Sequence, residues 1–155
     1  AVNRDNSGQD GISGQQQAVK TAPDFTLQSL DGQSLHLAEQ RGRVVVLNFW
    51  ATWCSPCVQE MPLFQQFAQR YPSELVVVGV NLQENLDTVQ AFVTKIGVSY
   101  PIVLDENGAV SELFRVVGLP DTFIIDQEGV IRKRHIGSLS WDQLDAYLIQ
   151  LGVGE

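Results

Sequence analysis

Apolar residues along the chain recur with the two periods that distinguish strands from helices. Residues 44–49, Val-Val-Val-Leu-Asn-Phe, are mostly β-branched and apolar on both faces, which predicts a central strand covered on both sides. Residues 75–80 predict a second buried strand of the same kind. Between them, residues 55–70 place apolar side chains at three- and four-residue steps, which predicts a helix, and we expect Pro62 to kink it.

The remaining elements are short, and turn and capping residues mark their limits. An Asp-Gly pair at residues 31–32 predicts an N-terminal hairpin. Asn85 or Asp87 is placed to cap a helix that Gly97 ends, and a Ser-x-x-Gln capping box beginning at Ser140 opens the last helix. The other predicted elements are an extended segment at 101–104, a short helix at 110–114 and hairpin strands at 122–125 and 130–135.

Strands and helices alternate along most of the chain, and a hairpin and a helix come last. This order predicts an α/β fold, a mixed central sheet with helices on both faces. Right-handed strand–helix–strand crossovers supply the parallel pairs, and the terminal hairpin supplies an antiparallel edge. Residues 132–135, Arg-Lys-Arg-His, lie on that edge strand, and we interpret them as a solvated edge that resists mispairing.

The first 22 residues differ in composition from the rest of the chain. They are rich in Gln, Gly, Ser, Asn and Asp, so they bury too little apolar surface to offset the entropy of ordering. We expect residues 1–22 to be a flexible tail or tether, and residues 23–155 to form a single domain. The segment lacks the regions of an intact signal peptide; a tether left after removal of an export signal or anchor, and a cloning remnant, both agree with it.

Composition and charge narrow the class of protein. The chain has 155 residues, of which 44% are hydrophobic, and a formal net charge of −8. A chain of this length buries about 68–70% of its unfolded surface, so its core needs neither a disulfide nor a metal. Its apolar runs are far shorter than the roughly 20 residues of a membrane-spanning helix. The acidic charge argues against a general nucleic-acid binder.

The most informative feature is a pair of cysteines, Cys54 and Cys57, separated by Ser55 and Pro56. The pair lies between the buried strand and the helix that follows it. Unpaired N–H groups and a partial positive charge at a helix start stabilise a thiolate, which is the nucleophilic form of cysteine. We therefore expect Cys54 to have a lowered pKa and to attack disulfides, and Cys57, about one turn further on, to complete the exchange. Pro56 fits the first helical turn, where its missing N–H does no harm.

Three other interpretations of the two cysteines stay open from the residues alone. A structural disulfide that closes so short a loop stabilises the fold weakly. Half of a zinc site lacks its complement, because the two histidines, His36 and His135, have no paired-ligand spacing. Inert core cysteines are the third interpretation. Redox chemistry is favoured, since the pair lies at a strand-to-helix junction.

The residues around the cysteines resemble the active-site segment of the thioredoxin superfamily. The matching segments are Phe-Trp-Ala-Thr-Trp-Cys-Ser-Pro-Cys at 49–57, Ala-Pro-Asp-Phe at 22–25, Glu-Met-Pro at 60–62 and Gly-Leu-Pro-Asp-Thr-Phe at 118–123. Residues 23–151 are similar to the extracytoplasmic branch, the periplasmic or membrane-anchored thiol-disulfide oxidoreductases that include the cytochrome c maturation reductants. The resemblance implies a thioredoxin-like fold with a strand–helix insertion between residues 81 and 108.

The resemblance implies a role for each residue of the site. Cys54 is expected to be the attacking thiol and Cys57 the resolving thiol, with Pro120 as a cis-proline facing them. The chain just before Pro120, at Leu119, is expected to pair with an extended substrate peptide. Glu60 shares a helix face with Cys57 and is placed to accept its proton.

Other residues near the cysteines are expected to contact the substrate: Trp53, as a partly exposed wall, Ser55 and Pro56. In cytosolic thioredoxins a buried aspartate stands at the position of Asn48, which cannot take a proton at neutral pH. If a carboxylate serves in resolution, Glu60 is therefore the better choice.

The resemblance also implies partners and a location. We expect a disulfide-containing partner protein as substrate and an upstream electron donor, with no nucleic acid, cofactor or metal. Reduction of the partner is the expected direction. The expected location is extracytoplasmic, in the bacterial periplasm or at the outer face of the membrane, as a monomer tethered by a segment absent from this sequence.

Two other functions are left open. A thiol peroxidase is one, because peroxiredoxins share the core and the Ala-Pro-Asp-Phe opening. They place proline seven and threonine three residues before their reactive cysteine, where this chain has Leu47 and Ala51. A binding or assembly module with incidental cysteines is the other.

Overall fold

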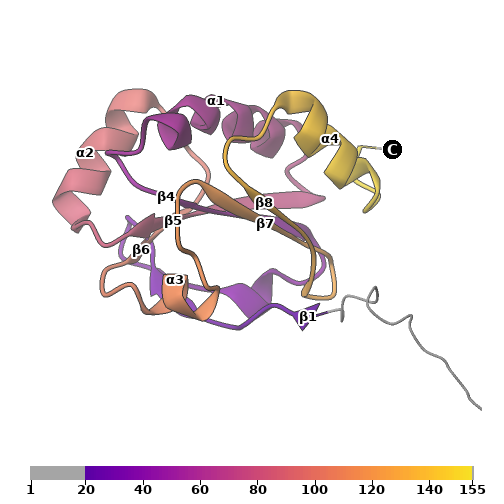
Figure 1. The fold of residues 1–155 in the computed structure, drawn as a ribbon, viewed down its shortest axis with the longest axis horizontal. Coiled ribbons are helices and arrows are strands. Elements are labelled where there is room, and N and C mark those ends of the chain that lie inside the picture. Colours follow the sequence, from indigo (N-terminus) through magenta and orange to yellow (C-terminus); the bar gives the residue numbers. More distant parts are fainter. Residues whose placement is uncertain (1–19, 155) are drawn as a thin grey trace, which may run out of the picture.

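The centre of the molecule is a mixed β-sheet, and the computed structural model describes residues 20–154. The strands are β1 (Lys20–Thr21), β2 (Thr26–Gln28), β3 (Ser34–His36), β4 (Val44–Trp50), β5 (Leu75–Leu82), β6 (Ile102–Asp105), β7 (Asp121–Ile125) and β8 (Val130–Ile136). Six of them form one sheet in the order β1-β8-β7-β4-β5-β6, and β2 and β3 form a separate hairpin (Figure 1). β4, β5 and β6 are parallel, whereas β7 is antiparallel to β4 and β8 is antiparallel to β7.

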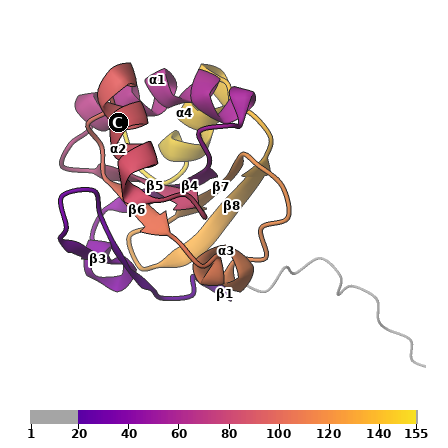
Figure 2. The same cartoon turned by 90° about the vertical axis from the view of Figure 1, so that its left-hand side faces the viewer.

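Helices cover both faces of the sheet, which confirms the predicted α/β fold. They are α1 (Ser55–Arg70), α2 (Leu86–Ile96), α3 (Ala109–Leu113) and α4 (Trp141–Ile149), with a 3-10 turn at Leu37–Gln40. Figures 1 and 2 show α1, α2 and α4 on one side of the sheet, and α3 with the β2–β3 hairpin on the other. Over residues 20–154, none of these helices combines the length and the apolar character that crossing a membrane requires.

The central strand β4 is buried along its whole length, as the apolar run predicts. Its side chains alternate between two core clusters. Those at even-numbered positions share a cluster with Met61 and Phe64 of α1, and those at odd-numbered positions share one with Phe25 and Phe114. Fully burying an apolar side chain of this size contributes about 1.5–3 kcal/mol. Both clusters therefore fix the end of β4, where the cysteines follow.

The predicted ends of two helices are confirmed. The Asn85 side chain accepts a hydrogen bond from Thr88 N at 2.9 Å and caps α2, and Gly97 ends α2 with a φ of +77°, a left-handed conformation that glycine adopts without strain. At the start of α4, Ser140 and Gln143 form both hydrogen bonds of a capping box. These local signals mark where α2 and α4 begin and where α2 ends, and packing of their buried residues on the sheet stabilises both helices.

The described chain is ordered three residues before the expected start at Pro23. Lys20–Thr21 form β1, which pairs with the start of β8, and Ala22 is buried. Strand pairing uses backbone groups, so the polar composition of these residues does not prevent it. The rest of the predicted tail, residues 1–19, lies outside the described residues.

The basic residues 132–134 on β8 are exposed, as expected of a solvated edge, but two of them are also paired with carboxylates. The Arg132 Nε donates to Asp126 at 2.7 Å, and the Arg134 guanidinium donates twice to Asp121, at 3.1 and 2.6 Å. Both carboxylates are buried, so each arginine neutralises a charge that burial makes costly to leave unpaired.

Candidate active site

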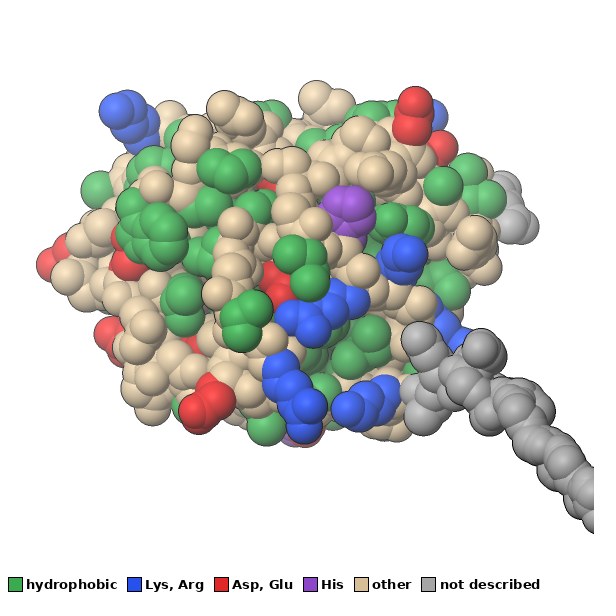
Figure 3. Space-filling model, viewed as in Figure 1, with side chains coloured by type: hydrophobic (Ala, Val, Ile, Leu, Met, Phe, Trp, Pro, Cys, Tyr) green, Lys and Arg blue, Asp and Glu red, His purple; other side chains and the backbone are tan. Residues whose placement is uncertain are grey.

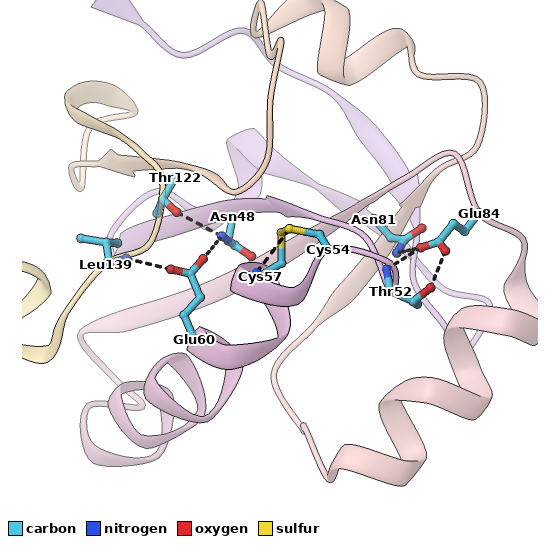
Figure 4. The surroundings of a disulfide bond; sticks show 9 residues. All are labelled: Asn48, Thr52, Cys54, Cys57, Glu60, Asn81, Glu84, Thr122 and Leu139. Atoms are coloured by element: carbon cyan, nitrogen blue, oxygen red, sulfur yellow. Dashed lines mark hydrogen bonds between the residues drawn. A yellow bond between two sulfur atoms is a disulfide. The ribbon is translucent and has the colours of Figure 1, made fainter.

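The two cysteines lie at the junction between the end of β4 and the start of α1. β4 ends at Trp50, a short turn follows, and Cys54 occupies the N-cap of α1 in an extended conformation. Cys54 and Cys57 are joined by a disulfide, with their Cα atoms 5.3 Å apart (Figure 4). The Cys54 Sγ accepts a hydrogen bond from Cys57 N at 3.3 Å. A backbone N–H of the first helical turn is thus aimed at the sulfur on which we expect negative charge to develop.

The two sulfur-bearing residues differ in exposure. Cys54 keeps 5% of its surface exposed, less than expected for an attacking group, and Cys57 keeps none. Cys54 is therefore the residue of the pair that an outside molecule reaches, as its predicted role requires. Ser55 and Pro56, the two residues between them, are exposed on the first turn of α1.

A second segment reaches the cysteines from β7. The Leu119–Pro120 peptide bond is cis. β4 and β7 are antiparallel, with Phe49 opposite Asp121, so the residue before Asp121 lies opposite Trp50 at the end of the sheet that leads to the cysteines. The sheet register therefore brings Pro120 and Cys54 to the same end of the molecule, as the sequence resemblance implies.

Large apolar side chains are exposed at this end of the sheet. Trp53 is 69% exposed, whereas Trp50 is fully buried, so Trp53 is the tryptophan that forms an outer wall. Val117, in the loop that leads to Pro120, is 94% exposed, and Ile136, opposite Asp121 on β8, is 66% exposed. Exposed apolar groups of this kind mark surfaces that contact other molecules.

Glu60 lies buried beneath the cysteine pair, three residues along α1 from Cys57. It keeps only 4% of its surface exposed. Its Oε1 accepts a hydrogen bond from Asn48 Nδ2 at 3.1 Å, and its Oε2 accepts one from Leu139 N at 2.9 Å (Figure 4). Burial raises the pKa of the Glu60 carboxyl from 4.5 to about 7, although both hydrogen bonds oppose this shift. Near neutral pH this carboxyl can therefore both take up and release a proton.

Asn48 links Glu60 to the neighbouring strand. Its Nδ2 also donates to Thr122 Oγ1 at 3.0 Å, across the β4–β7 pair. Its Oδ1 is buried without a hydrogen-bond partner among the described residues. Asn48 is thus a polar group in a buried strand whose amide nitrogen makes two hydrogen bonds. A carboxylate from α1 thus lies beside the strand position where cytosolic thioredoxins carry an aspartate.

A second carboxylate, Glu84, holds the turn before the cysteines and was not predicted from the sequence. Glu84 lies between β5 and α2. It accepts hydrogen bonds from Thr52 N at 2.9 Å, from Thr52 Oγ1 at 2.5 Å and from Asn81 Nδ2 at 2.8 Å (Figure 4). Glu84 lies 32 residues from Thr52 and outside the segments that carry the family resemblance, and the β4–β5 pairing brings the two together.

The described residues offer little to a metal ion. Nowhere in residues 20–154 do three or more His, Cys, Asp or Glu side chains gather as ligands. The two histidines are engaged elsewhere: His36 contacts Asp24 at 2.6 Å, and His135 contacts Tyr147 Oη at 3.1 Å. Neither supplies the complement that half of a zinc site would need.

Comparison with known proteins identifies the family. The model of the AhpC/TSA family matches residues 18–134. The chain belongs to this family. The thioredoxin-like protein YneN of Bacillus subtilis (strain 168) is 37% identical over 135 residues, which are 85% of this chain and 79% of YneN. The thiol-disulfide oxidoreductase ResA of Geobacillus thermodenitrificans (strain NG80-2) is 37% identical over 129 residues, which are 83% of this chain and 74% of ResA.

Solved structures agree with these relatives. A putative thiol:disulfide interchange protein DsbE from Chlorobium tepidum has a TM-score of 0.80 and 31% identity, covering 86% of this chain and 96% of that one. A secreted disulfide oxidoreductase from Mycobacterium tuberculosis has a TM-score of 0.74 and 25% identity, covering 82% of this chain and 96% of that one. The predicted thioredoxin-like fold and thiol-disulfide oxidoreductase activity are confirmed, as is the resemblance to the extracytoplasmic branch. That activity implies a disulfide-containing substrate partner.

The raised pKa of Glu60 predicts how stability depends on pH. Between about pH 4.5 and pH 7 the folded protein keeps the Glu60 proton and the unfolded chain has lost it, so the unfolding free energy falls as pH rises and then levels off. The difference between the ordinary pKa of 4.5 and the folded-state pKa of about 7 corresponds to a change in unfolding free energy on the order of 3 kcal/mol. Urea denaturation of the oxidised wild type and of Glu60→Gln across pH 4–8 measures this change. The unfolding free energy of the wild type should fall with rising pH relative to that of the variant. A difference that stays constant over this range contradicts the assignment.

The three hydrogen bonds to Glu84 predict that this residue stabilises the turn before Cys54. Glu84→Gln keeps one acceptor oxygen and turns the other into a donor, so it should destabilise the oxidised protein by about 1–3 kcal/mol in urea denaturation. Glu106→Gln, at an exposed turn, is the matched control and should leave stability within about 0.5 kcal/mol of wild type. Equal effects of the two substitutions would count against the network.

Proposed function

We propose that this protein reduces disulfide bonds of partner proteins through the Cys54–Cys57 dithiol. One arrangement carries the proposal: the cysteine pair opens α1, close to the cis-proline loop at Leu119–Pro120 and beside the buried carboxyl of Glu60. The three features supply the nucleophile, a surface for the substrate and a proton acceptor.

Cys54 performs the first step. Its thiolate attacks one sulfur of the partner's disulfide, a bond forms between that sulfur and Cys54 Sγ, and the other partner sulfur leaves as a thiolate. The N–H of Cys57, which points at Cys54 Sγ in the oxidised protein, stabilises the charge before attack. Cys57, being fully buried, takes no part in this encounter.

Cys57 and Glu60 perform the second step. Cys57 loses its proton to the Glu60 carboxylate, directly or through water, and the resulting thiolate attacks Cys54 Sγ. The Cys54–Cys57 disulfide forms, and the second partner sulfur leaves as a thiolate. Two electrons have then passed from the dithiol to the partner. A pKa of about 7 lets Glu60 accept this proton at neutral pH and release it afterwards.

The substrate contacts are proposed for the exposed residues of this end of the sheet. The backbone at Leu119 pairs with an extended segment of the partner beside the scissile disulfide. Trp53 supplies an apolar wall, and Ser55 and Pro56 line the approach to Cys54, since all three are exposed around a nearly buried sulfur.

Further turnovers need an upstream electron donor. The oxidised site must regain two electrons from a second dithiol, which we place on another protein. An extracytoplasmic location, as a tethered monomer, is proposed from the family branch, and the description of one structural relative as secreted supports it. The thiol peroxidase alternative gains no support. Where peroxiredoxins have proline and threonine before the reactive cysteine, this chain has Leu47 and Ala51, which are buried apolar residues.

Single-cysteine variants test the proposal. Cys57→Ser should form a mixed disulfide with insulin that persists, because the resolving thiolate is missing, whereas Cys54→Ser should form none. Mass spectrometry detects the adduct, and insulin-reduction assays should show at least about 100-fold loss for both variants. Retained insulin reduction by Cys54→Ser contradicts the assigned nucleophile. The direction is tested with one peptide in its dithiol and disulfide forms. If the oxidised wild type oxidises the dithiol peptide faster than the reduced wild type reduces the disulfide peptide, the proposed direction is wrong.

A further inference from the structure

A basic groove lies on the β8 and α3 side of the molecule, outside the cysteine site. Its volume is about 310 Å³. Five of the ten Lys and Arg residues of the chain line it, namely Lys20, Arg115, Arg132, Lys133 and Arg134. Within the described part of the chain no Asp or Glu lines it. Such a concentration of positive charge is unexpected in a protein with a net charge of −8.

Two of these cations are held in place by buried carboxylates. Arg134 donates to Asp121, and its Nη2 also donates to the carbonyl oxygen of Arg115 at 3.0 Å. Its guanidinium carbon lies 4.9 Å from the centre of the Phe123 ring. Arg132 is paired with Asp126. These arginines form a rigid rim, but much of their charge is already neutralised.

Two further cations of the groove, Lys20 and Arg115, carry charge that is free to bind a ligand. Lys20 and Arg115 are exposed, and among residues 20–154 neither has a carboxylate within 4.0 Å of its side-chain nitrogens. Lys133 also lines the groove, but its ammonium lies 5.1 Å from the centre of the Tyr147 ring, and Tyr147 belongs to α4 on the other side of the sheet. We therefore do not count Lys133 as part of the charged rim.

The remaining lining of the groove is mostly apolar. Leu113, Phe114, Phe123 and Ile131 lie among the cations. Leu113 is 51% exposed and Ile131 is partly exposed, whereas Phe114 and Phe123 are buried beneath them. Figure 3 shows Lys and Arg side chains gathered at the lower right of one face, with hydrophobic atoms between them. A ligand for such a surface carries both negative charge and apolar side chains. Because the surface is concave, it suits an extended peptide better than a flat membrane.

The groove adjoins the cis-proline loop. Arg115 lies five residues before Pro120, and Asp121, which holds Arg134, follows Pro120 directly. The Arg115 and Arg134 end of the groove is thus the end near the cis-proline loop, within reach of a polypeptide that presents a disulfide to Cys54 and extends past Leu119 towards β8.

We propose that the groove docks an acidic, extended segment of the partner protein, with its carboxylates on Lys20 and Arg115 and its apolar side chains on Leu113 and Ile131. This inference rests on the proposed function, because it assigns a second contact to the same partner. Charge complementarity gives specificity and a faster encounter, and apolar contact adds area that salt does not screen.

Binding of a cysteine-free peptide tests the groove separately from the redox chemistry. The probe is a fluorescein-labelled peptide of four Glu-Phe repeats, compared by fluorescence anisotropy with its Gln-Phe counterpart. The acidic peptide should bind the full chain at least about five-fold more tightly, and the advantage should shrink between 50 and 300 mM NaCl. The double variant Lys20→Gln/Arg115→Gln should weaken its binding about four- to twenty-fold.

The matched control removes the same charge elsewhere. Arg70→Gln/Lys95→Gln lies on the exposed ends of α1 and α2 and should change affinity for the acidic peptide less than two-fold. Equal loss in both double variants, or equal affinity for the two peptides, overturns the proposal. Binding to sedimented phosphatidylglycerol vesicles that requires Lys20 and Arg115, without peptide binding, assigns the groove to a membrane and also overturns it.

The redox activity is measured in the same variants. Lys20→Gln/Arg115→Gln should keep wild-type reduction of a neutral disulfide peptide and lose about four- to twenty-fold in kcat/KM on one with a Glu-Phe extension. If the wild type reduces neither disulfide peptide, the proposed function is wrong. Binding of the cysteine-free peptide still tests the groove in that case.

Discussion

A carboxyl group buried beneath a disulfide is the constraint on which the rest of this site depends. Glu60 gives up its hydration for two hydrogen bonds, from Asn48 on β4 and from the backbone of Leu139 before α4. Those donors do not fully replace water, so burial leaves the carboxyl with a pKa near 7. The same bonds join α1, β4 and the loop before α4 at the point where the cysteines stand. The stability of the fold therefore depends on this group, and the mechanism that we propose gives its raised pKa a use in proton transfer.

The sheet register does most of the assembly. Pairing of β4 with β7 sets Asn48 against Thr122 and carries Pro120 to the end of the sheet that leads to Cys54. Pairing of β4 with β5 brings Glu84 to Thr52, in the turn just before Cys54. A slip of one residue in either pair would exchange the side chains between the two faces of the sheet, and so between the two core clusters. Catalytic geometry is thus a consequence of how the two core clusters hold β4.

The sequence predicts the local parts of this arrangement and misses the distant ones. The Cys-x-x-Cys spacing, the caps of α2 and α4 and the buried strands all follow from neighbouring residues, and Glu60 follows from helical spacing together with family resemblance. Glu84 escapes prediction because its partner Thr52 is 32 residues away. The exposure of the β8 arginines is predicted, but their pairing with Asp121 and Asp126 is missed, because only the tertiary structure shows that these carboxylates are buried. The same two arginines, Arg132 and Arg134, line the basic groove.

Proton transfer to Glu60 is tested most directly by timing the resolution step. Ellman's reagent releases one thionitrobenzoate when Cys54 is modified and a second when Cys57 resolves the mixed disulfide, so stopped-flow absorbance separates the two steps. In wild type the second rate should rise with pH around a midpoint near 7 and exceed that of Glu60→Gln at least about ten-fold at pH 7.5, with Glu112→Gln as the exposed control. Coincident pH profiles for wild type and Glu60→Gln would contradict the account.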